Sequence, residues 1–123
     1  MTRVTLRDLC AVRSGDKGDI ADVSLFADDV AAYDAIRQSV TASVVADHFA
    51  GLVDGRVERY EAANVLALKF VMHGALGGGA PRSLRADNLG KTLGASLLRL
   101  EIDVPADVAA GAKRGGRAPL PWR

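Results

Sequence analysis

The chain has 123 residues and a mass of 12.9 kDa, the size of one globular domain. Its 49% hydrophobic residues can form a modest core, while 16 basic against 15 acidic residues exclude the strongly basic balance of a nucleic-acid-binding domain. The first residues form no apolar signal segment, and no apolar run is long enough to span a membrane, so we expect a soluble, cytoplasmic protein. Cys10 is the single cysteine, which excludes an intrachain disulfide and a cysteine-rich zinc site; we expect neither a metal nor a cofactor.

Two strands are predicted at the start of the chain. Residues 4–12 begin with β-branched and apolar types among polar ones, as a partly buried strand does. Residues 20–27 alternate in character, with Val23 and Leu25 on one face. Residues 13–19, between these two segments, are predicted to form a loop.

A helix is predicted after the second strand. Asp28 offers a side-chain oxygen to the free amides of a first helical turn. Apolar residues then recur every three or four positions, so one side of the helix is expected to face the core; they are Val30, Tyr33, Ile36, Val40 and Val44. Thr41 and Ser43 indicate either a kink or the start of a second helix, because short hydroxyl side chains compete for backbone hydrogen bonds. Gly51 is the predicted end of this helical region.

The second half of the domain repeats this pattern. Residues 56–61 alternate like a strand with one solvated face, and residues 65–72 are more continuously apolar, like a central strand. Asp87 is the predicted cap of a second helix, in which leucines recur at helical spacing; these are Leu89, Leu93, Leu97 and Leu100. Residues 99–104 alternate as an outer strand does.

This order of elements predicts an α+β fold. Two strands, a helix, two more strands, a second helix and a last strand are too few strands for a doubly wound sheet. They favour a two-layer sandwich, in which helices cover one face of a mainly antiparallel sheet. A ferredoxin-like arrangement is the leading candidate. We assign the domain to residues 1–104.

Residues 105–123 differ from this domain in composition. They are rich in proline and glycine, which break helices, and we expect an extended or mobile tail. Trp122 near its end is either loosely ordered or docked on this or a neighbouring subunit. The tail is also basic, with Asp107 opposed by Lys113, Arg114, Arg117 and Arg123.

Two segments have residues suited to binding. The first is the loop between the first two strands, where glycines permit close backbone approach and basic residues suit a phosphate or carboxylate. Its candidate residues are Arg13, Ser14, Gly15, Asp16, Lys17 and Gly18. The same residue types also fit a charged hairpin turn, and they favour that interpretation. The spacings of a Walker A loop and of G-x-G-x-x-G are absent, so nucleotide binding in those modes is not expected.

The second segment contains three successive glycines, which indicate a tight bend or a surface against which a ligand lies closely. Its arginines suit carboxylate or phosphate, and its histidine is a type of residue used in acid–base chemistry. The candidate residues are His73, Gly77, Gly78, Gly79, Arg82 and Arg85. For His73 alone a structural role is favoured, because the sequence shows no evident partner for acid–base work.

Several ordered segments of the chain resemble one family. They are residues 13–18, 59–61, 67–68, 74–79, 83–85 and 90–93, together with Asn64, Phe70 and Asp87. In combination they resemble the small C-terminal domain of acyclic terpene utilisation (AtuA-like) proteins, from residue 5 to about residue 104. The resemblance implies a ferredoxin-like α+β fold and a role near acyl-CoA or terpenoid-acid catabolism.

The resemblance also implies a partner. In that family the small domain usually follows a much larger N-terminal domain, whereas this chain begins with the small one. We therefore expect an accessory or ligand-binding module that acts with a separate, larger AtuA-like subunit, with an anionic small molecule as the candidate ligand. One alternative is a small enzyme acting on a carboxylate or a CoA thioester, in which Lys17, Arg82 or Arg85 holds the anion and His73 is the acid or base. The other is a homo-oligomer held by an exposed sheet face or edge.

Overall fold

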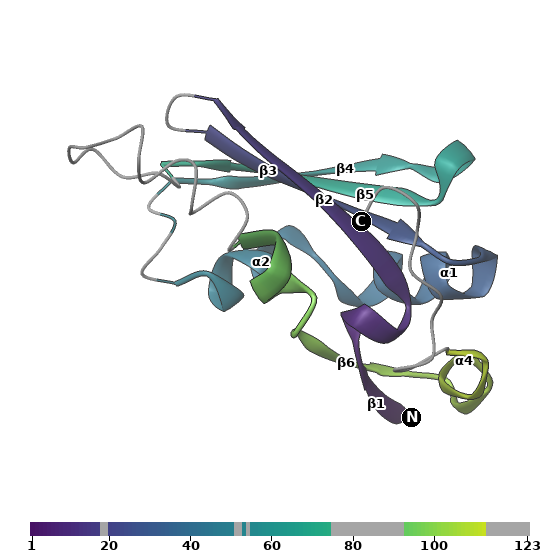
Figure 1. The fold of residues 1–123 in the computed structure, drawn as a ribbon. Helices are drawn as coiled ribbons and strands as arrows, with labels where there is room; N and C mark the ends of the chain where they lie inside the picture. The colour runs from purple at the N-terminus through teal and green to yellow at the C-terminus, as the bar shows by residue number, and fades with distance from the viewer. Residues whose placement is uncertain (18–19, 51–52, 54, 75–92, 113–123) are drawn as a thin grey trace.

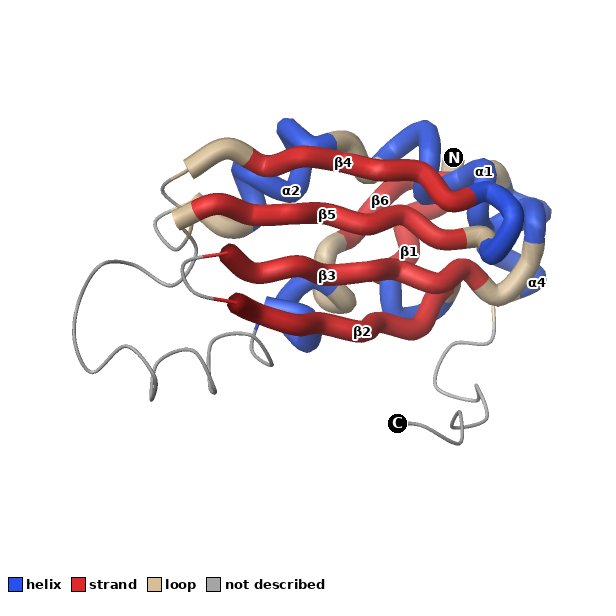
Figure 2. Tube along the Cα trace, turned by 90° about the horizontal axis from the view of Figure 1, so that it is seen from above, coloured by secondary structure: helices blue, strands red, loops and turns tan. Residues whose placement is uncertain are grey.

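The main sheet has four antiparallel strands. The computed structural model describes residues 1–17, 20–50, 53, 55–74 and 93–112. In it, the strands lie in the order β2 (Cys10–Lys17), β3 (Ile20–Ala27), β5 (Ala67–His73) and β4 (Val57–Ala62). The described helices lie against one face of this sheet, and no described element covers the other face (Figures 1 and 2). The predicted α+β sandwich, with helices on one face of an antiparallel sheet, is confirmed.

The remaining two strands form a separate pair on the helix side. Strands β1 (Thr2–Thr5) and β6 (Glu101–Val104) are antiparallel, with Val4 opposite Ile102. Both of those residues are buried, while Arg3 reaches Asp103 at 3.2 Å on the exposed side. The last predicted strand therefore exists, but it pairs with the start of the chain and does not extend the main sheet.

The prediction of one strand over residues 4–12 is wrong. A 3-10 turn at Leu6–Asp8 separates β1 from β2. The Asp8 carboxylate accepts hydrogen bonds from the amide and the hydroxyl of Thr5, at 3.3 and 3.2 Å. These local hydrogen bonds stabilise the turn between the two strands.

The first helical region is two helices. Helix α1 (Val30–Ser39) begins at Asp29, whose side chain accepts a hydrogen bond from the Ala32 amide at 2.8 Å, so Asp29 and not Asp28 is the cap. Helix α2 (Ala42–His48) begins at Thr41, whose hydroxyl accepts from the Val44 amide. Of the two predicted alternatives, the start of a second helix is therefore confirmed.

The last helical region before β6 is described at residues 93–97, where Leu93 and Leu97 are fully buried. Its predicted cap Asp87 and the predicted helix end at Gly51 both lie outside the described residues.

The start of the predicted tail is a helix. Helix α4 (Ala106–Gly111) follows Pro105, and Val108 and Ala109 pack against the core. Proline is tolerated before a first helical turn, and the sequence Ala-Asp-Val-Ala-Ala has high helix propensity. The prediction of an extended segment is therefore wrong for residues 106–111, while residues 113–123 lie outside the described part.

The core lies between the main sheet and the helices. Alternate residues of the sheet point toward the helices and are fully buried; they include Val23, Leu25, Leu68, Phe70 and Met72. The helices contribute Ile36, Val45, Phe49, Leu93 and Leu97. Cys10 is buried beside them, and its thiol lies 3.1 Å from the Leu6 carbonyl oxygen. None of the described helices is long and apolar enough to cross a bilayer.

Candidate functional site

The uncovered face of the main sheet carries a group of polar side chains. Because Val23 and Leu25 on β3 point into the core, their neighbours Asp22 and Ser24 point the other way. The register of the four strands places further residues on this face. We call it the outer face; its described side chains include Arg13, Ile20, Asp22, Ser24, Phe26, Glu58, Tyr60, Lys69, Val71 and His73.

The two predicted binding segments meet at one end of the sheet. Lys17 on β2 is opposite Ile20 on β3, and Ile20 is opposite His73 on β5. Since neighbouring strands are about 4.8 Å apart, the backbones of Lys17 and His73 are about 10 Å apart. The end of the first segment and the start of the second therefore lie within reach of one ligand.

The first segment is not a loop over most of its length. Residues 13–17 continue β2 and pair with residues 20–24 of β3, so they form one arm of a hairpin. Its predicted residues alternate between faces: Arg13 and Gly15 lie on the outer face, while Ser14 lies on the inner face against Gly94. Asp16 and Lys17 are placed by their backbone, and Gly18 lies outside the described residues.

His73 has a partner that the sequence analysis missed. Its Nε2 lies 2.9 Å from Glu58 Oε1 on the neighbouring strand β4, and the other Glu58 oxygen lies 3.3 Å from Arg56 Nε. The hydrogen bond from His73 is the main reason that the pKa of Glu58 is lowered, with Arg56 as a second cause. The sequence alone does not show this pairing. Glu58 and His73 come together because they share a face on neighbouring strands, and that requires the register of β4 and β5.

The backbone beside this pair is tightly packed. The Gly55 amide donates to the His73 carbonyl oxygen at 2.8 Å, and the His73 amide donates to the Arg56 carbonyl oxygen at 3.0 Å. A β-carbon at Gly55 would lie 2.4 Å from the His73 carbonyl oxygen, so only glycine fits there without a shift. Gly55 therefore fixes the strand end that carries His73.

A shallow cavity of about 250 Å³ lies on the outer face over β2 and β3. Arg13, Asp22, Ser24 and Phe26 line it, together with Ser14 and Gly15. Lys69 lies next to Ser24 on β5 and is exposed. Arg13 and Lys69 form no ion pair with a described carboxylate, so both charges face solvent and are available to an anion.

Arg59 belongs to the fold and not to this face. It lies opposite buried Phe70, and its Nη1 donates to the carbonyl oxygens of Arg37 and Val40, at 2.7 and 2.9 Å. Its Nη2 lies 2.7 Å from Glu61. A cation at the carboxyl end of α1 satisfies carbonyls that have no helical partner.

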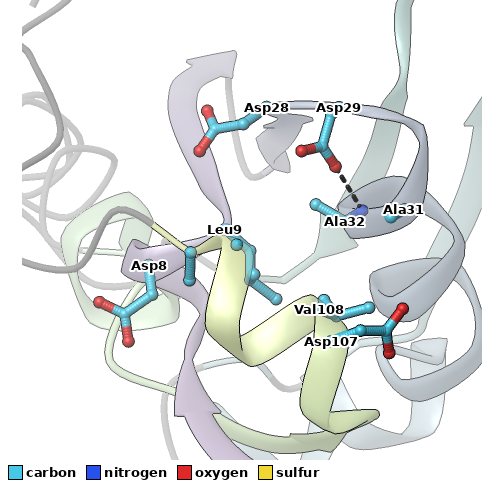
Figure 3. Close-up of a pocket in the computed structure, with 10 residues that line it drawn as sticks. Asp8, Leu9, Asp28, Asp29, Ala31, Ala32, Asp107 and Val108 are labelled. Carbon is cyan, nitrogen blue, oxygen red and sulfur yellow. Dashed lines mark hydrogen bonds between the residues drawn. The ribbon is translucent and has the colours of Figure 1, made fainter.

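A second cavity, of about 50 Å³, is acidic (Figure 3). Four aspartates line it: Asp8, Asp28, Asp29 and Asp107. Two of them have structural hydrogen bonds, since Asp8 accepts from Thr5 and Asp29 caps α1. Within the described ranges no group of histidine, cysteine and acidic side chains has the arrangement of a metal site.

Part of the second predicted segment lies outside the described residues; these positions are Gly77, Gly78, Gly79, Arg82 and Arg85. Besides Glu58, the sequence analysis missed Asp22, Ser24 and Lys69 as site residues. Each lies within a predicted strand. Whether its side chain points to solvent or to the core depends on which face of the sheet the helices cover.

Comparison with known proteins gives one match. The sequence profile of the AtuA ferredoxin-like domain matches residues 4–103, which is most of the chain. No curated protein and no solved structure matches.

Proposed function

Because the chain belongs to the AtuA ferredoxin-like domain family, we propose that it is a non-catalytic binding module that acts with a separate, larger AtuA-like subunit in acyl-CoA or terpenoid-acid catabolism. The observation that carries this proposal is the outer face. It is a sheet face without a covering layer in the described structure, and Lys17 and His73, the described ends of the two predicted binding segments, lie at one end of it. A family domain with an open face is suited to complete a site on a partner.

The chemistry of the outer face supports a docking role. Ile20 on β3 and Tyr60 on β4 are large apolar side chains of the outer face, and they are 39% and 52% exposed. Exposed apolar groups within a charged surround are typical of a protein interface. The described outer face carries no nucleophile paired with a base, which is why a binding role is preferred to catalysis.

Affinity capture tests the proposal. The tagged full chain is incubated with an extract of its native cells, and the retained proteins are identified by mass spectrometry. We expect a larger AtuA-like protein to be retained, and Ile20→Glu and Tyr60→Glu to reduce its recovery at least tenfold. Val30→Glu is the matched control, because Val30 is 63% exposed on α1, away from the outer face. A chain without residues 113–123 tests the tail separately.

Retention of no AtuA-like protein would contradict the proposed partner. A self-associating chain, measured by light scattering on the purified protein, would then favour the homo-oligomer. Equal loss of recovery with Val30→Glu would contradict docking through the outer face.

One observation favours a second candidate, a small enzyme acting on a carboxylate or a CoA thioester. His73 has the carboxylate partner that orients and supports an imidazole in acid–base catalysis, with a 2.9 Å contact to Glu58. Turnover of an acyl-CoA thioester or a terpenoid acid by the purified chain, lost in His73→Gln, would establish this candidate. The same turnover in His73→Gln as in the unchanged chain would exclude His73 as the acid or base.

A further inference from the structure

Two basic side chains flank one hydroxyl on the outer face. Arg13 on β2 and Lys69 on β5 are each directly opposite Ser24, which lies on β3 between them. The two outer strands of this trio are about 10 Å apart, so long basic side chains from both can reach an anion above Ser24. Both cations are exposed, and neither has a described carboxylate as an ion-pair partner.

An apolar surface continues from this trio along β3. Phe26 follows Ser24 on the same face and also lines the 250 Å³ cavity. The residues opposite Phe26 on the two neighbouring strands are Ala11 and Ala67, which are small and buried. The exposed part of the Phe26 ring is therefore the apolar surface at this end of the cavity.

The opposite end of the cavity is negatively charged. Asp22 precedes Ser24 on the outer face, and its carboxylate extends over Gly15, 3.4 Å from the position of a β-carbon there. A single anionic group can lie between Arg13 and Lys69 while its apolar portion extends toward Phe26. A second anionic group placed toward Asp22 is repelled.

We infer that this cavity binds the carboxylate of a small organic monoanion, with Arg13, Lys69 and Ser24 as donors and Phe26 as the contact for an apolar portion. The inference rests on the proposed function only in taking the outer face as the working surface. Asp22 disfavours a second negative charge at the end of the cavity away from Phe26. The carboxylate is the group recognised because two cations and a hydroxyl donor match its two oxygens.

The test is a titration of the full chain, labelled with nitrogen-15, with sodium octanoate. We expect saturable amide shifts over β2, β3 and β5, with a dissociation constant of about 1 mM, the weak affinity expected of a small ligand on an open face. Acetate lacks the apolar portion and 1-octanol lacks the charge, so both should bind at least fivefold more weakly. Suberate, with a carboxylate at each end, should also bind more weakly than octanoate, because its second carboxylate would lie beside the apolar Phe26 ring.

Matched variants assign the effect to residues. Arg13→Gln and Lys69→Gln should each weaken octanoate binding about fivefold, the loss of one charged hydrogen bond on an exposed surface. Arg99→Gln is the control, since Arg99 is exposed and unpaired among the described residues but precedes β6. Asp22→Asn should strengthen octanoate binding, because it removes a negative charge beside the bound carboxylate.

Three results overturn the inference: no saturable shift, equal binding of 1-octanol, or shifts that Arg13→Gln and Lys69→Gln leave unchanged. The affinity capture separates this inference from the proposed partner. Octanoate binding without capture of an AtuA-like protein leaves the ligand site standing and removes the partner. Capture that is lost in Lys69→Gln, without any octanoate binding, means that the cations pair with a carboxylate of the partner protein, which overturns the small-molecule site.

Discussion

Gly94 lies against Ser14: a β-carbon at position 94 would be 3.1 Å from the Ser14 hydroxyl oxygen and 3.3 Å from the Ser14 β-carbon. Gly94 is within the helical residues 93–97, and Ser14 is on the inner face of β2. A glycine inside a helix lowers its intrinsic stability by about 1 kcal/mol relative to alanine. The close approach of this helix to the sheet is the physical reason for a glycine there.

Gly94→Ala should therefore lower the free energy of unfolding by about 1 kcal/mol, because overpacking exceeds the gain in helix propensity. When Ser14 is also changed to Gly, the crowding disappears, and Gly94→Ala should become stabilising by a similar amount. Urea unfolding of the four proteins of this double-mutant cycle measures the coupling. Additive effects would show that the two residues do not press on each other.

Removing the cap that Arg59 makes on α1 should lower the stability of the fold. Arg59→Met removes two hydrogen bonds to the carbonyls of Arg37 and Val40 and should lower the free energy of unfolding by roughly 2 kcal/mol. Arg37→Met is the control. Its 3.8 Å contact with Asp34 is on the surface, and we expect a change below about 0.5 kcal/mol. An equal effect of both substitutions would show that the cap contributes nothing beyond a surface charge.

Removing the hydroxyl of Tyr33 should raise the stability of the fold. Tyr33 is 4% exposed on α1, and its hydroxyl has no hydrogen-bond partner among the described residues. Tyr33→Phe removes a buried polar group and should raise the free energy of unfolding by about 1 kcal/mol. Tyr60→Phe, at an exposed position, should change it little. A less stable Tyr33→Phe protein would mean that the hydroxyl is hydrogen-bonded in solution.

Most of the fold could be predicted from the sequence because its strands and helices have clear periodicity. Strand β3 agrees with its predicted bounds at residues 20–27, and the start of a second helix near Thr41 was one of two predicted alternatives. The 3-10 turn at Leu6–Asp8 was missed because it depends on local hydrogen bonds, while the residues around it looked like one strand. Helix α4 was missed because the proline and glycine content of residues 105–123 was given more weight than the helix propensity of its alanines.

The site was less predictable than the fold. His73 and Arg13 were identified by residue type alone, whereas Glu58 and Lys69 became apparent only from the register between strands. A sequence gives the alternation of each strand but not which of its faces is left uncovered. That choice depends on where the helices pack, which is a tertiary property.

A side chain at Gly55 should lower the stability of the fold at the strand end that carries His73. Gly55→Ala places a β-carbon 2.4 Å from the carbonyl oxygen of His73, so the backbone must move, and we expect a loss of roughly 2 kcal/mol in the free energy of unfolding. Gly111→Ala is the control, because no atom lies within 4 Å of its added carbon. Urea unfolding measures both variants, and an equally small change in the two would show that the strand end adapts without cost.

The pair of Glu58 and His73 predicts a pH dependence. The His73 hydrogen bond is the largest single cause of the lowered pKa of Glu58, and the charge and hydrogen bond of Arg56 lower it further, so His73→Ala and Arg56→Ala should each raise that pKa toward its usual value. Because the folded carboxyl has the lower pKa, its stabilising effect is present above the usual glutamate pKa of about 4.3 and is lost as the pH falls through the folded value. Carbon-13 titration of the Glu58 carboxyl in the unchanged chain, in His73→Ala and in Arg56→Ala measures the three pKa values. An unchanged Glu58 pKa in His73→Ala would mean that the histidine does not hold the carboxylate ionised.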